Sequence, residues 1–153
     1  MDVFLSLLGL GVTAFLAATL LPGGSELALA GLVAAGTAPV WALVTVASIG
    51  NIAGSWVNWL IGRGARHLVH ADAPAEGRRA AAVQAAFQRA GHLFRRFGTW
   101  TLLFSWVPVV GDPLTLVAGA SGVPVLRFLT LVAIGKSVRF VVVAAIAHFS
   151  IVN

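Results

Sequence analysis

The stretch LLPGGSELALAG, residues 20–31, interrupts a chain that is otherwise apolar on both sides. Proline followed by two glycines cannot continue a regular helix, so the apolar segment that starts at Val3 must end near this point. A short apolar segment, 26–36, follows the break, and a long one, 39–61, comes next. At about 1.5 Å per residue, the long segment spans the ~30 Å hydrocarbon core of a bilayer. The pattern predicts a broken helical hairpin followed by a crossing helix.

The composition indicates that these helices lie in a membrane. Of the 153 residues, 59% are hydrophobic and 10% are charged, and the mean hydropathy is +0.95. Between Val3 and Ile61 the only formal charge is Glu26. A soluble domain does not have this composition, so we predict an all-α integral membrane protein. The chain begins with Asp2 rather than a basic segment, so the first apolar segment is expected to remain in the mature protein.

The same unit recurs in the second half of the chain. Pro22 and Pro108 each precede an acidic residue by four positions, Glu26 and Asp112. The second copy runs through an apolar segment at 99–107, a break at 108–113, a short segment at 114–122 and a full-length span at 124–149. If the two crossing helices run in opposite directions, the units form an inverted repeat, which is typical of transporters. The alternative is four ordinary helices with proline kinks.

We therefore predict a single membrane domain, 1–153, in three parts: repeat one at 3–61, a basic amphipathic segment at 63–97 and repeat two at 98–149. The stretch from Arg63 to Arg96 holds seven arginines and two acids, so it carries a net charge of +5, equal to that of the whole chain. Short loops retained in the cytoplasm carry such an excess of basic residues. The predicted location is the bacterial inner membrane with this loop inside, and the charge is not taken as a sign of nucleic-acid binding.

The basic segment also predicts an amphipathic helix. Apolar residues recur at alternating intervals of four and three, at Val83, Phe87, Ala90, Phe94 and Phe97. Such a helix either lies on the membrane with its arginines toward anionic headgroups or packs over the helical bundle. The predicted membrane-surface contacts are Arg78, Arg79, Arg89, Arg95 and Arg96.

Four ionisable residues are predicted to lie inside the hydrocarbon region: Glu26, Asp112, Lys136 and Arg139. A charge at the bilayer centre costs about 2.5–3.5 kcal/mol, so such residues should be paired or functional. Lys136 and Arg139 are three positions apart and share a helix face. They therefore form either a neutral cluster that holds the repeats together or a site where a substrate phosphate competes with a carboxylate while a proton on the acid balances charge.

Other candidate substrate contacts surround this set. Ser48, Asn51, Ser55 and Asn58 form a polar stripe that should face the interior of the first crossing helix, although interhelical bonding explains the asparagines equally well. At the two breaks, the candidates are Ser25, Gly23, Gly24 and Gly111, where backbone N–H groups at a helix start can bind an anion. Gly50 and Gly54 predict close helix packing. Trp41 and Trp59, near the two helix ends, predict interfacial anchors.

Catalysis and cofactor binding find no support. The chain has no cysteine, and Gly135-Lys136-Ser137 lacks the upstream glycine of a phosphate-binding loop. Ser25 has no evident histidine–acid pair, because His148 stands near the far end of its segment. The histidines of the basic segment are too dispersed to indicate a metal. We expect a protein that is not an enzyme and that has no cofactor, catalytic residue or metal.

Four stretches resemble the DedA family of bacterial membrane proteins, also called SNARE-associated or VTT-domain proteins, and within it the small YqaA-like branch. They are LLPGGSELALAG at 20–31, GNIAGSWVNWLIGRG at 50–64, FRRFG at 94–98, and WVPVVGDPLTLVAGASG at 106–122 followed by GKSVRF at 135–140. The resemblance implies two opposed re-entrant hairpins with transmembrane helices. It also implies a transporter or scramblase of anionic and other phospholipids, or a role in recycling undecaprenyl phosphate.

One departure from the family bears on the substrate. Members with that role generally carry two arginines around the second break, where this chain has Ser105 and Gly111. Lys136 and Arg139 are then the cations left to meet an anionic headgroup. We expect anionic membrane lipids as partners, and the small size leaves a homo-oligomer open. The alternatives are a proton- or ion-coupled carrier of a small solute, which needs a water-filled vestibule rather than a sideways opening, and a non-transporting assembly factor.

Overall fold

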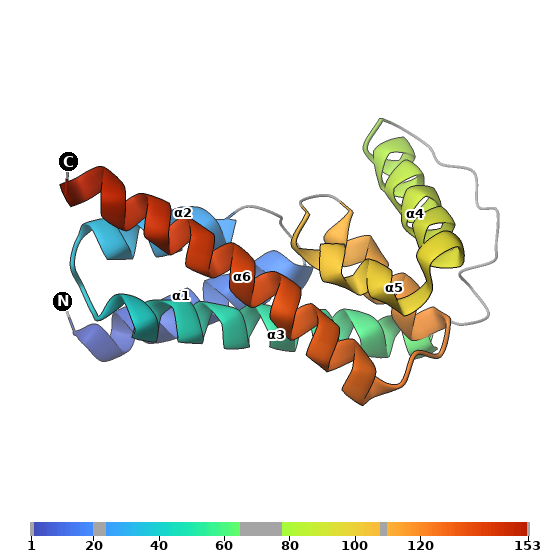
Figure 1. Cartoon of the computed structure of the whole chain (residues 1–153), viewed down its shortest axis with the longest axis horizontal. Helices are drawn as coiled ribbons and strands as arrows, with labels where there is room; N and C mark the ends of the chain where they lie inside the picture. The colour runs from blue at the N-terminus through green and yellow to red at the C-terminus, as the bar shows by residue number, and fades with distance from the viewer. Residues whose placement is uncertain (1, 20–23, 65–77, 108–109, 153) are drawn as a thin grey trace. The chain divides into compact units, whose positions relative to one another are not determined.

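The computed structural model describes residues 2–19, 24–64, 78–107 and 110–152, and all the regular structure in these residues is helical (Figure 1). Within these described residues, two helices are long and apolar enough to cross a membrane. They are α3 (Val40–Gly64) and the part of α6 from Val125 to Ser150. The remaining α-helices are α1 (Val3–Thr19), α2 (Gly24–Ala34), α4 (Arg78–Phe97) and α5 (Gly111–Ala120). A 3-10 helix, η1, runs from Gly98 to Trp106, and α6 as a whole is Val125–Val152.

The predicted breaks fall between helices as the prolines and glycines require. The first lies between the end of α1 and the start of α2, and the second between η1 and α5. At about 1.5 Å per residue, the 11 residues of α2 cover only about 16 Å, too short to cross a bilayer. The segment before the second break differs from an ordinary helix, because GTWTLLFSW is a 3-10 helix. Its aromatic and β-branched residues have low α-helix propensity.

The two short helices after the breaks end in the same way. Gly36, after α2, and Gly122, after α5, have φ angles of 60° and 75°. In each case the glycine N–H and the next N–H bond back to the helix, as in Gly36 to Val33 and Thr37 to Leu32. This is a Schellman cap, for which glycine is favoured because it adopts the left-handed conformation without strain. A proline then precedes each long helix.

The described chain forms two compact units. Unit 1 comprises Met1–Ser55 and Ala133–Asn153, so it holds α1, α2, the first part of α3 and the last part of α6. Its buried core is made by Leu10, Ala14, Leu29, Val33, Leu43, Ala47, Phe140 and Ala144. Within it, α1 and α2 lie side by side (Figure 1). Helix α3 runs parallel to α1, since Val46, Asn51 and Gly54 contact successive residues of α1.

Unit 2 comprises Trp56–Val132 and holds the last part of α3, α4, η1, α5 and the first part of α6. Its core contains Trp59, Ala90, Leu102, Leu114, Ala118, Val123, Phe128, Leu131 and Val132. The indole N–H of Trp59 donates a hydrogen bond to the carbonyl oxygen of Val123 over 3.2 Å. The prediction of an interfacial anchor is therefore wrong for Trp59, which is 5% exposed, whereas Trp41 is 74% exposed.

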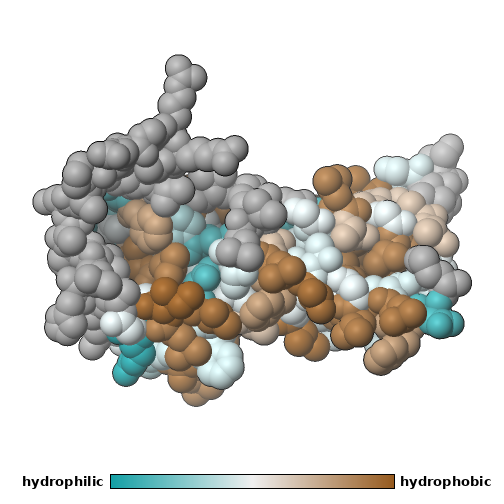
Figure 2. Space-filling model, turned by 180° about the vertical axis from the view of Figure 1, so that it is seen from behind, coloured by the Kyte–Doolittle hydropathy of each residue, from teal (hydrophilic) through white to brown (hydrophobic). Residues whose placement is uncertain are grey.

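Large hydrophobic side chains cover much of the surface of the described residues. Leu27, Leu126 and Trp41 are among the most exposed of them. Figure 2 shows hydrophobic residues spread over one face. A protein surrounded by water rarely exposes such large apolar areas, so these surfaces indicate contact with hydrocarbon.

Candidate functional site

An ion pair joins α2 and α6 in unit 1. The guanidinium of Arg139, on α6, contacts the carboxylate of Glu26, on α2, and their side chains are 23% and 17% exposed. Two charges removed from water to this extent must compensate each other. The structure therefore brings together one acid and one base of the four predicted ionisable residues.

Local folding explains why these two residues meet. Glu26 is in the first turn of α2, directly after the break. Leu29 and Val33, one and two turns further on, share a buried core with Phe140 and Ala144 of α6. This apolar contact holds α2 against α6. A carboxylate in the first turn also interacts favourably with the positive end of the helix dipole.

Lys136 lies one turn before Arg139 on α6 and is 3% exposed. Residues three apart occupy the same face of a helix, so the two cations lie on neighbouring positions. Ser25, beside Glu26, is also buried. Unit 1 thus contains a buried polar region with two cations and one acid at the start of a short helix.

Asp112 is in unit 2, in the first turn of α5, where its side chain is half-buried. The hydroxyl of Thr115 donates a hydrogen bond of 2.6 Å to the backbone carbonyl oxygen of Asp112. Asp112 in α5 and Glu26 in α2 thus both lie in the first turn of their helices. The assembly of all four charged residues into one site remains a prediction.

The polar stripe of α3 faces the interior, as its spacing predicts. Ser48, Asn51, Ser55 and Asn58 are all buried. The side-chain amide of Asn51 donates a hydrogen bond of 3.0 Å to the carbonyl oxygen of Ala14 on α1, and the Ser55 hydroxyl donates to the carbonyl oxygen of Asn51. Asn51 therefore has the interhelical bonding role that the sequence left open. The buried hydroxyl of Ser48 has no hydrogen-bond partner among the described residues.

Glycines at two of the predicted positions allow backbones to touch. A Cβ on Gly50 would meet the carbonyl oxygen of Gly11, and one on Gly54 would meet that of Phe15. In unit 2, a Cβ on Gly111 would collide with the backbone of Ser105. Ser105 and Gly111 are therefore packed backbone to backbone in this chain. Gly24 is exposed with open space beside it, and Gly23 lies outside the described residues.

The middle of the apolar stripe of α4 packs on protein, whereas Phe97 at its end is exposed. Ala90 is fully buried and Phe94 packs against the core of unit 2, where α4 contacts α5 and η1. Among the surface arginines, Arg89, Arg95 and Arg96 are exposed, and the side chains of Arg78 and Arg79 lie outside the described part. The packed arrangement is therefore favoured over a helix that inserts this stripe into the bilayer. The arginines remain available on the opposite face.

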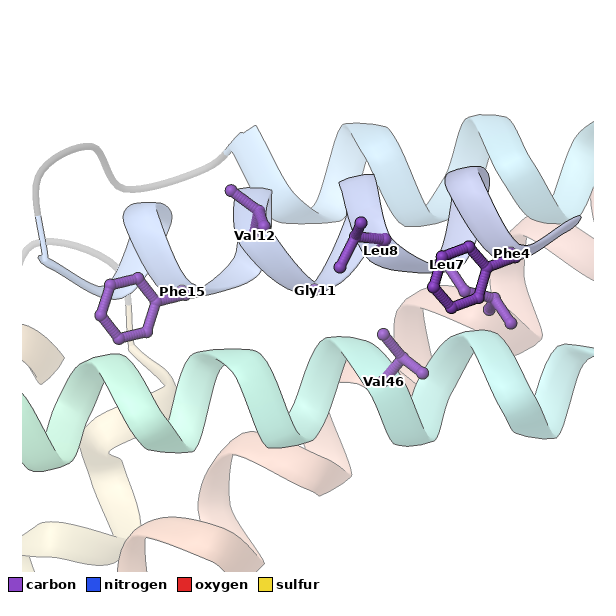
Figure 3. Close-up of a pocket in the computed structure, with 7 residues that line it drawn as sticks. All are labelled: Phe4, Leu7, Leu8, Gly11, Val12, Phe15 and Val46. Carbon is purple, nitrogen blue, oxygen red and sulfur yellow. The ribbon is translucent and has the colours of Figure 1, made fainter. Parts of the chain in front are cut away.

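An apolar groove of about 510 Å³ runs along α1 in unit 1 (Figure 3). Its lining consists of Phe4, Leu7, Leu8, Gly11, Val12 and Phe15 from α1 and Val46 from α3. No charged or polar side chain lines it, so its chemistry suits hydrocarbon and not a headgroup. The sequence pattern did not indicate this groove, because it depends on how α1 sits against α3 at Gly11.

Known proteins match this chain over most of its length. The family model of the VTT domain matches residues 21–149. The chain is 40% identical over 148 residues to inner membrane protein YqaA of Escherichia coli and of Shigella flexneri, covering 95% of this chain and 93% of each relative. It is 32% identical over 137 residues to an uncharacterised protein of Haemophilus influenzae, covering 85% of this chain and 80% of that protein. No solved structure matches.

Proposed function

Because the chain belongs to the DedA family of VTT-domain membrane proteins, we propose that it moves an anionic lipid across the bacterial inner membrane. The substrate would be a phospholipid or undecaprenyl phosphate. The observation that carries the proposal is the ion pair between Glu26 and Arg139, with Lys136 buried one turn away. Ionisable residues within membrane segments mark substrate or ion pathways.

The chemistry of the site follows from its charges. A lipid phosphate competes with the Glu26 carboxylate for the guanidinium of Arg139, because both are bidentate partners for arginine. Protonation of Glu26 removes the competing charge and allows the phosphate to bind, which couples lipid movement to a proton. The first turn of α2 adds backbone N–H groups and the positive end of the helix dipole.

Internal symmetry supports an alternating-access mechanism. Unit 1 contains the short helices α1 and α2, unit 2 contains α4, η1 and α5, and each unit holds the beginning of one long helix and the end of the other. Both short helices carry an acid in the first turn and end in the same glycine cap. We propose that the chain is an inverted repeat of two re-entrant hairpins, in which each repeat exposes the charged residues to one side of the membrane.

Transport is tested by reconstitution into liposomes with fluorescent anionic or zwitterionic lipids and a membrane-impermeant quencher. Wild type is expected to move anionic lipid between leaflets, and Glu26→Gln, Arg139→Gln and Lys136→Ala to move it at least tenfold more slowly. Arg127→Gln is the matched control, because Arg127 is an exposed cation on the same helix. Equal rates for wild type, Glu26→Gln and Lys136→Ala would reject the proposal. Uptake of a small solute without lipid movement would favour a solute carrier instead.

A further inference from the structure

Exposed aromatic side chains line one side of η1 in unit 2. A 3-10 helix has three residues per turn, so Trp100, Leu103 and Trp106 are aligned on one side. Trp100 is 67% exposed and Trp106 is 45% exposed, whereas Leu102 and Ser105 on another side are buried. Phe97, three residues before Trp100, is also exposed. Phe97, Trp100 and Trp106 form an exposed aromatic ridge, and Leu103, between the two tryptophans, packs against the core of unit 2 and anchors it.

Two arginines stand at the beginning of this ridge. Arg95 and Arg96 are exposed in the last turn of α4, where the negative end of the helix dipole stabilises cations. The guanidinium of Arg96 lies 5.3 Å from the centre of the Phe97 ring. The sequence contains no acidic residue from 77 to 111, so no carboxylate of this segment neutralises the pair. Arg96 therefore places a positive charge next to the ridge, and Arg95, whose guanidinium lies near Gly91 one turn back on α4, adds a second one close by.

The junction between α4 and η1 fixes the arginines relative to the ridge. Gly98 has a φ of 61°, which turns the chain between the two helices. The buried hydroxyl of Thr101 lies 2.8 Å from the carbonyl oxygen of Gly98 and 3.2 Å from that of Leu93. These contacts tie η1 to the last turn of α4. The arginines and tryptophans are thus held as one surface and not on a free loop.

We propose that this surface binds one anionic lipid lengthwise, with its phosphate on Arg95 and Arg96 and an acyl chain along the aromatic ridge. The nine residues of η1 extend about 18 Å at about 2 Å per residue, close to the ~15 Å of one leaflet of hydrocarbon. The positive charge selects an anionic headgroup, and tryptophans next to it are the residues found at the membrane interface. This site is separate from Glu26 and Arg139 and does not rest on the proposed transport.

Binding is tested on the full-length protein in detergent by native mass spectrometry with phosphatidylglycerol or phosphatidylcholine. Wild type is expected to prefer phosphatidylglycerol. Two surface arginines account for about a ten- to thirtyfold difference in affinity between the anionic and the zwitterionic lipid. Arg95→Gln/Arg96→Gln should therefore lose the preference. This variant should bind both lipids with the affinity that wild type has for phosphatidylcholine. Arg63→Gln/Arg127→Gln removes the same charge from two other exposed positions and should keep the preference.

The apolar half of the site has its own variants. Trp100→Ala/Trp106→Ala should weaken the binding of both lipids to a similar extent. Trp100→Phe/Trp106→Phe should retain binding, and this comparison separates loss of the ridge from loss of folding. Inorganic phosphate at millimolar concentration should not displace phosphatidylglycerol. The proposal fails if phosphate displaces it, if both arginine double variants lose the preference equally, or if Arg95→Gln/Arg96→Gln binds like wild type.

Discussion

The side-chain amide of Asn51 donates a hydrogen bond of 3.0 Å to the backbone carbonyl oxygen of Ala14, which joins α3 to α1. Asn51→Ala should lower the free energy of unfolding by about 0.5–1.5 kcal/mol, the range for a single interhelical bond in a membrane protein. Thermal unfolding in detergent measures this. Thr45→Ala is the control, because Thr45 is exposed on the same helix and bonds only to its own helix, at Trp41. Equal loss in both variants would contradict the role of Asn51.

Close contact with α1 requires a glycine at position 54, whereas no contact requires one at position 9. A Cβ on Gly54 would lie 2.5 Å from the carbonyl oxygen of Phe15 and 2.8 Å from the Cβ of Ala18, whereas one on Gly9 would have nothing within 4 Å. Gly54→Ala should therefore destabilise the protein by about 1–3 kcal/mol, as overpacking does. Gly9→Ala should stabilise it by up to about 1 kcal/mol through helix propensity. A melting temperature that moves in the same direction for both variants would refute this packing.

The ion pair between Glu26 and Arg139 predicts a specific pattern of stabilities. Glu26→Gln or Arg139→Gln alone leaves one partly buried charge without its partner, so each should lower the melting temperature. The double variant removes both charges and should recover part of the loss, with a coupling of about 1–3 kcal/mol in a double-mutant cycle. Strict additivity would show that the contact contributes nothing to stability.

The tryptophans predict distinct fluorescence behaviour in bilayers. Trp59 is buried and bonded to Val123, whereas Trp41 and Trp100 are strongly exposed. In single-tryptophan variants with phenylalanine at the other positions, brominated lipids should quench Trp41 and Trp100 several-fold more than Trp59. Quenching of Trp59 to the same degree would mean that lipid reaches the core of unit 2. Trp59→Phe should cost at least about 1 kcal/mol of stability, because it removes the indole N–H bond and leaves part of the buried ring volume unfilled.

The re-entrant hairpin is tested by labelling single cysteines in this cysteine-free chain. Asp2, Ala35 and Arg89 are all exposed. If α1 enters the membrane and α2 returns, Asp2→Cys and Ala35→Cys should react with an impermeant thiol reagent from the same, outer side. Arg89→Cys should react only after the membrane is permeabilised. Reaction of Asp2→Cys and Ala35→Cys from opposite sides would exclude a re-entrant hairpin.

Helix positions and the buried polar stripe followed from local sequence, because prolines, glycines and apolar periodicity act within a few residues. The pairing of Glu26 with Arg139 was also predictable in kind, since charges in hydrocarbon need partners. Which residue would pair with which was not predictable, because four ionisable residues allow several different pairs. The 3-10 form of η1 escaped prediction, since apolar runs of this length suit several conformations.

Contacts that depend on tertiary packing were the least predictable. Trp59 lies near a helix end, where tryptophans usually meet the membrane interface, yet it is in the core of unit 2. A possible signal was Gly62, three residues later, which allows the backbone of Leu116 to come close. Likewise, periodicity identified the apolar face of α4 but could not show whether protein or lipid would cover it.

Because of the groove beside Gly11, the packing of α1 against α3 in unit 1 depends on the lipid or detergent around the protein. Phe4 and Phe15 border a space of about 510 Å³ that only apolar groups can fill favourably. In a bilayer the fatty chains of neighbouring lipids would complete this packing, and the contact between α1 and α3 would then depend on lipid as well as on protein. Detergents with longer, more flexible tails should therefore preserve the native form better than short-chain ones, and delipidation should loosen the N-terminal helix first.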